Sequence, residues 1–149
     1  MEMPSRFFNP RNNATTIAEI WKVVTNQRSA AAELYALVDA GGPDDAIRRV
    51  LAERDAKAPK YYFVEGEVNG RGYFLLQEGK TAKAVTLFRL NTELYPESWN
   101  VWDSLGEALL MSGDTDGAKR MYEKSVALNP ENKNGKEALA RMANGSATK

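Results

Sequence analysis

The sequence predicts an all-α protein in which antiparallel helix pairs stack into a short solenoid. Apolar residues recur at helical spacing, and no segment alternates apolar and polar residues as a half-buried strand would. From residue 65 onward the sequence also matches itself at a shift of 34 residues. A period of this length is typical of repeat proteins whose units are helix pairs. We therefore expect about seven or eight helices and no sheet.

The composition is that of an ordinary globular domain. Hydrophobic residues make up 43% of the 149 residues and charged residues 27%, which suits a packed core. The 20 basic and 20 acidic residues give a net charge of zero, so we expect neither nucleic acid nor a membrane as a partner. There are no cysteines and no histidines, which removes thiolate ligands, the commonest metal ligand and the usual proton shuttle. We expect no enzymatic activity, no metal and no cofactor.

The chain divides into four expected segments. They are an irregular N-terminal arm, a degenerate helical repeat region, two regular repeats with a solvating C-terminal helix, and a disordered tail, at residues 1–15, 16–64, 65–142 and 143–149. Prolines and asparagines surround Phe7 and Phe8 in the arm. No segment has the apolar stretch that a secretory signal or a membrane span needs, so we expect a cytoplasmic protein.

Capping residues predict three helices in the degenerate region. Thr16 and Glu19 fit a capping box at the start of the first helix. Ser29 is expected to cap the second, which the glycines at 41 and 42 would end. Pro43 suits the first turn of the third helix.

The matched positions of the 34-residue period are small, aromatic or turn-forming residues. The pairs are Gly72 with Gly106, Gly79 with Gly113, Ala84 with Ala118, Phe88 with Tyr122, Leu94 with Leu128, and Pro96 with Pro130. Small residues allow two helices to approach closely, and an aromatic ring fills the space beside them. The glycines in the interhelical turns are expected to need positive φ, and the prolines to end the second helices.

These residues resemble the tetratricopeptide repeat family, whose pattern reads W-x2-L-G-x2-Y, then A-x3-F, then P. In the last full repeat the matching residues are Trp102, Leu105, Gly106, Leu109, Ala118, Tyr122 and Pro130. In the preceding repeat Arg71 replaces the expected leucine, so we expect the packing of that helix to differ locally. The resemblance implies a solenoid that binds a protein or peptide, with Trp102 as a core residue between helices.

A narrower resemblance covers roughly residues 32–132. The stretches 62–69, 88–91 and 95–107 are similar to the helical tail that often follows serine β-lactamase-like hydrolase domains in bacteria. This implies a bacterial origin and an accessory or regulatory role beside an enzyme, whose catalytic domain is absent here. Dimerisation is a further alternative, because the amphipathic segment 16–26 is suited to packing against a second copy in a homodimer.

Stacked helix pairs are expected to form a concave surface lined by the first helix of each pair. Polar or aromatic residues recur there at helical spacing on successive helices, and the candidate binding residues are Asn69, Tyr73, Gln77, Asn100, Asp103 and Glu107. The 34-residue register makes Asn69 equivalent to Asp103 and Tyr73 equivalent to Glu107. Because two exposed carboxylates would repel an acidic ligand, we expect a basic or neutral peptide segment as the partner.

Overall fold

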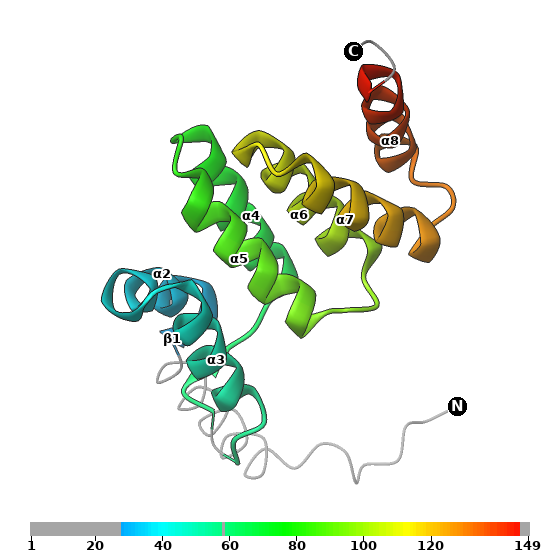
Figure 1. Ribbon diagram of the computed structural model, residues 1–149. Coiled ribbons are helices and arrows are strands. Elements are labelled where there is room, and N and C mark those ends of the chain that lie inside the picture. The colour runs from blue at the N-terminus through cyan, green and yellow to red at the C-terminus, as the bar shows by residue number, and fades with distance from the viewer. Residues whose placement is uncertain (1–27, 58, 147–149) are drawn as a thin grey trace, which may run out of the picture.

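The computed structural model describes residues 28–57 and 59–146, and helices dominate this part of the chain (Figure 1). The helices of the described residues are α2 (Ala30–Gly41), α3 (Pro43–Arg54), α4 (Glu65–Gln77), α5 (Thr81–Leu94), α6 (Trp99–Ser112), α7 (Thr115–Leu128) and α8 (Lys133–Ser146). Helices α4, α6 and α8 begin at residues 65, 99 and 133, which repeats the 34-residue period. The predicted all-α solenoid is thus confirmed. The expected arm with Phe7 and Phe8, and the expected helix from Thr16, lie outside the described residues.

The helix ends follow the predicted capping residues. The hydroxyl of Ser29 accepts a hydrogen bond from the backbone N–H of Ala32 at 3.3 Å, at the start of α2. Gly42, between α2 and α3, has a φ of 84°. In the turns that follow α4 and α6, Gly79 and Gly113 have φ values of 72° and 90°, which confirms that these turns use the left-handed region.

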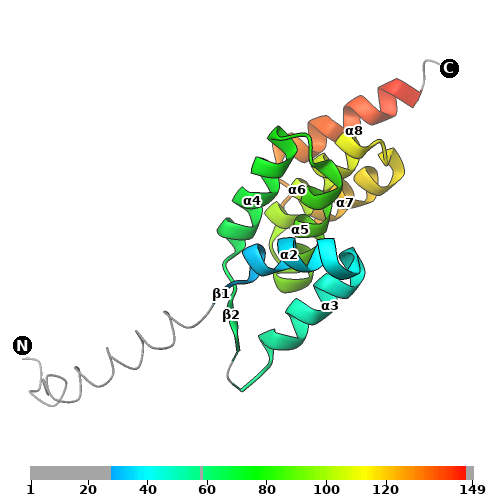
Figure 2. The same ribbon diagram turned by 90° about the vertical axis from the view of Figure 1, so that its left-hand side faces the viewer.

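One short parallel strand pair departs from the expectation of no sheet. Strand β1 (Arg28–Ser29) pairs with β2 (Tyr61–Tyr62), and Arg28 lies opposite Tyr61. Figure 2 shows the two strands side by side, where the chain enters and leaves the α2–α3 hairpin. Two-residue strands are too short to produce an alternating pattern in the sequence, so periodicity alone does not reveal them.

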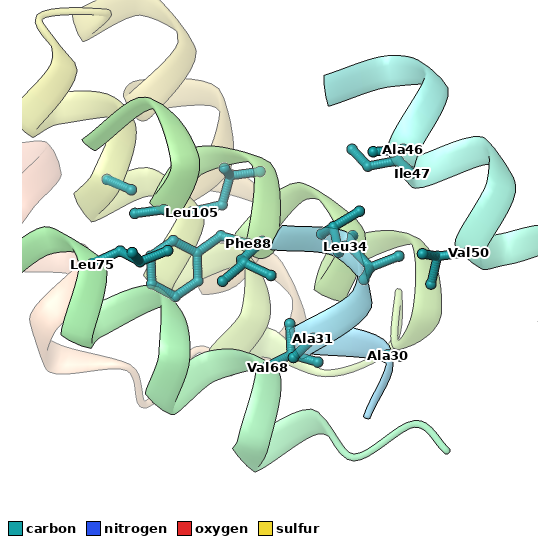
Figure 3. Packing of buried hydrophobic residues seen from close by; sticks show 14 of the residues in the cluster. Ala30, Ala31, Leu34, Ala46, Ile47, Val50, Val68, Leu75, Phe88 and Leu105 are labelled. Atoms are coloured by element: carbon teal, nitrogen blue, oxygen red, sulfur yellow. The ribbon is translucent and has the colours of Figure 1, made fainter. Parts of the chain in front are cut away.

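The core of the first regular repeat is built around Phe88 on α5. Its side chain is fully buried, and Figure 3 shows it among apolar residues of several helices. Its ring meets that of Tyr73 edge-on, with 5.2 Å between centroids. A Cβ atom added to Gly72 would lie only 2.5 Å from the Phe88 ring, so α4 and α5 pack at a distance that only glycine permits. The predicted pairing of a small residue with an aromatic is therefore confirmed.

The second regular repeat has the same arrangement with a looser fit. A Cβ atom on Gly106 would lie 3.2 Å from the ring of Tyr122, which is 3% exposed. Helix α8 packs against α7 through Ala138, Leu139 and Met142. Trp102 is only half-buried, unlike the core residue that the repeat pattern predicts. Its indole N–H donates to the carbonyl of Pro96 at 2.8 Å, and this bond holds the ring at the edge of the helix pair.

The α2–α3 hairpin does not continue the regular stacking. In the regular part, α5 packs on α6 and α7 packs on α8, so that each second helix contacts the next first helix. Helix α3 instead makes its main contacts with α2 and α5, whereas α2 contacts both α4 and α5. The α2–α3 hairpin therefore packs differently from the two regular repeats. None of the described helices is both long and apolar enough to cross a membrane.

Candidate functional site

The inner helices α4 and α6 bring two of the predicted binding residues together. The hydroxyl of Tyr73 on α4 donates a hydrogen bond to Glu107 Oε2 on α6 at 2.9 Å. The same hydroxyl lies 3.2 Å from Ser104 Oγ. The 34-residue register thus places Tyr73 and Glu107 on one patch across the repeat junction.

Asp103 differs from the expectation of an exposed carboxylate, because it is only 6% exposed. Its Oδ1 accepts a hydrogen bond from Asn132 Nδ2 at 2.7 Å, and its Oδ2 accepts one from Asn134 Nδ2 at 3.1 Å. Both amides come from the start of α8, so Asp103 joins α6 to α8. A cationic ligand on the α4–α6 face would be attracted by the negative charge of this carboxylate, but it would not contact the carboxylate oxygens directly.

Asn132 is the residue that sequence reasoning missed. Its Oδ1 accepts a hydrogen bond from the backbone N–H of Gly135 at 3.1 Å, as an N-cap residue does. Its amide also donates to Ser125 Oγ at 2.9 Å, and Ser125 donates to the carbonyl of Trp99 at 2.9 Å. An asparagine directly before a helical segment is a recognisable capping signal, whereas its link to Asp103 depends on the tertiary structure.

The other predicted residues have different surroundings. Asn69 is half-buried, and its Oδ1 is buried without a hydrogen-bond partner among the described residues. Asn100 is half-buried at the start of α6, and Gln77 is exposed at the end of α4. These residues lie on the same two helices as Tyr73 and Glu107.

The patch is electrostatically negative. Neither Asp103 nor Glu107 takes part in an ion pair among the described residues. Burial raises the pKa of Tyr73 to about 12, and the negative charges of Glu107 and Asp103 contribute to the rise. Burial likewise raises the pKa of Tyr122 to about 12, again with contributions from these two carboxylates. No group of three or more histidine, cysteine or acidic side chains in the described residues is arranged to hold a metal ion.

Tyr73 is expected to ionise about two pH units later than an ordinary tyrosine, which has a pKa of 10.0. The raised pKa means that the fold favours the neutral phenol. The neutral Tyr73 phenol therefore contributes fully to the stability of the fold below pH 10. This contribution is lost as the pH rises through about 12. Absorbance titration of the phenolates should show that Tyr73→Phe removes a late-ionising group, with circular dichroism used to confirm that the protein is folded at each point. Loss of a group that ionises near pH 10 would contradict the assigned environment of Tyr73.

Comparison with known proteins supports the repeat assignment. Residues 99–142 match the family model described as tetratricopeptide repeat. The chain is 36% identical over 61 residues to the human Superkiller complex protein 3, a match that spans 41% of this chain and 4% of that protein. A mutant form of MamA has a similar structure, with a TM-score of 0.59 and 27% sequence identity, over 79% of this chain and 83% of that one. The resemblance to hydrolase tails stays a prediction.

Proposed function

Residues 99–142 belong to the tetratricopeptide repeat family, and from this premise we propose that the chain binds a basic or neutral peptide segment on the face formed by α4 and α6. Repeats of this family generally serve as non-catalytic scaffolds for protein interaction, which supports a binding function. The bound segment would lie across the inner helices, where successive repeats present equivalent side chains.

The observation that carries the proposal is the state of Glu107. Its carboxylate is half-buried, accepts a hydrogen bond from Tyr73, and forms no ion pair among the described residues. A Lys or Arg side chain of a partner would supply the missing positive charge. Asp103 would strengthen the attraction from below the surface, because its two hydrogen-bond partners are neutral amides.

Glu107→Gln is expected to weaken the binding of a cationic peptide without changing stability. The probe is a fluorescein-labelled, amidated peptide of alternating lysine and alanine, and its glutamate counterpart serves as the comparison. An exposed charge pair contributes about 0.2 to 1 kcal/mol, so the dissociation constant should rise by up to about fivefold. Fluorescence anisotropy measures this constant, and added salt should weaken binding of the lysine peptide to the wild-type protein.

The matched control is Glu123→Gln, which removes an exposed carboxylate from the outer helix α7. This variant should bind the lysine peptide as the wild-type protein does. Glutamine at residue 107 still accepts the hydrogen bond from Tyr73, so both variants should have unchanged melting temperatures. Equal affinity for the glutamate peptide, or equal losses in both variants, would contradict the proposed face.

A further inference from the structure

The departure of Arg71 from the repeat pattern coincides with a pocket. In α6 the equivalent residue is Leu105, which is 4% exposed and packs in the main core against the preceding repeat. In α4 the preceding hairpin is displaced, since α3 makes its main contacts with α2 and α5. A leucine at position 71 would therefore lack the contact with the second helix of the preceding pair that Leu105 makes in α6. Arg71 instead has a side chain that is 51% exposed.

The pocket beside Arg71 has an apolar lining and room for one side chain. Its volume is about 180 Å³, and its apolar lining residues are Tyr35, Phe74, Leu75 and Leu87, from α2, α4 and α5. An apolar cavity of roughly 150 Å³ accommodates a benzene molecule. Phe74, which lines the pocket, is 58% exposed. The volume of the pocket thus matches one aromatic or branched aliphatic side chain.

Arg71 provides the charge at this pocket that is least compensated. Lys80 and Glu78 also line it, but Lys80 Nζ lies 2.6 Å from Glu78 Oε2, so these charges neutralise each other. The nearest carboxylate to Arg71 is Glu67, with 3.7 Å between Nε and Oε1, and that oxygen already accepts the hydroxyl hydrogen of Ser29. Arg71 donates no hydrogen bond among the described residues, and a guanidinium fork suits a carboxylate.

We infer that this pocket binds the C-terminal residue of a peptide, with its apolar side chain between α2 and α4 and its carboxylate against Arg71. The pocket holds one side chain, and Arg71 is its least compensated cation, so the ligand must carry an apolar group and a carboxylate close together. A C-terminal residue has them on the same Cα atom. This site prefers a charge opposite to that preferred at Glu107, and the inference goes beyond the proposed function.

The test is a titration of the ¹⁵N-labelled protein with N-acetyl-L-phenylalanine, followed by amide chemical shifts. The uncharged N-acetyl-L-phenylalaninamide is the comparison. Both probes should shift the amide signals of Leu75 and Leu87, and the free acid should bind about two- to fivefold more tightly, as expected for an exposed ion pair. Arg71→Leu should abolish this preference for the acid while the amide still binds. High salt should reduce the preference in the wild-type protein.

Controls with three variants and one dipeptide make the outcome decisive. Arg120→Leu, on the exposed surface of α7, should retain the preference for the free acid. Phe74→Ala should weaken the binding of both probes. The amidated dipeptide N-acetyl-Phe-Asp should bind no more tightly than the phenylalaninamide, and binding as tight as that of the free acid would overturn the assignment to a chain terminus. Absence of shifts at Leu75 and Leu87, or a preference for the acid that persists in Arg71→Leu, would overturn the pocket itself. Glu107→Gln should bind both probes as the wild type does, so this inference and the proposed function are tested separately.

Discussion

Replacing Phe88 with alanine is expected to lower the free energy of unfolding by about 3 to 5 kcal/mol. The Phe88 side chain is fully buried and contacts the ring of Tyr73. It also lies against Gly72, where α4 and α5 approach closely. Its removal leaves a cavity between α4 and α5, and α5 is the helix against which both the first hairpin and the second repeat pack. The damage should therefore affect the whole stack and not one repeat alone.

Urea denaturation followed by circular dichroism measures this loss. The matched control is Phe74→Ala, which removes the same atoms from a side chain that is 58% exposed. A surface change of this kind should alter stability by about 0.5 kcal/mol or less. If the two variants unfold at the same urea concentration, Phe88 is not the central core residue.

Gly72→Ala is expected to destabilise the protein by about 1 to 3 kcal/mol. The new Cβ atom would lie 2.5 Å from the ring of Phe88, which is fully buried. Alanine normally stabilises a helix relative to glycine by about 1 kcal/mol, so the steric conflict must outweigh a favourable change in helix propensity.

Gly106→Ala provides the comparison at the equivalent place in the next repeat. Its Cβ atom would lie 3.2 Å from the Tyr122 ring, so a shift of a few tenths of an ångström relieves the contact. We expect the gain in helix propensity to offset most of this cost, with a net change within about 1 kcal/mol of zero. Thermal unfolding of the two variants should separate them clearly. A larger loss of stability in Gly106→Ala than in Gly72→Ala would contradict the closer packing of α4 on α5 than of α6 on α7.

The features predicted correctly from the sequence are those that recur at one period. Gly72 and Phe88 contact each other within one helix pair, and the same contact returns as Gly106 with Tyr122, so the sequence contains the packing rule twice. Ser29 and Gly113 act at helix ends, where the cause of the structure lies within a few residues. Helix ends and repeated packing contacts can therefore be predicted from a single sequence.

Features that depend on one specific distant partner were not predicted. The burial of Asp103 follows from Asn132 and Asn134 at the start of α8. In the preceding repeat Ser98 replaces Asn132 and Asn69 replaces Asp103, so no repeated pattern revealed this contact. The half-buried position of Trp102 follows from a hydrogen bond to the carbonyl of Pro96. The pocket at Arg71 depends on the displacement of α3 toward α5, which no local motif encodes.

The central position of α5 also determines how the fold comes apart. This helix contacts α2, α3, α4 and α6, whereas α8 makes its main contact with α7 alone. In a stack whose units are held mainly by their neighbours, opening begins at the least covered unit and proceeds inward. Among the described helices, α8 would therefore fray first, and the backbone amides of α5 would be the last to exchange their hydrogens with solvent. The hydrogen bonds from Asn132 and Asn134 to Asp103 join α8 to α6, and they should slow this fraying.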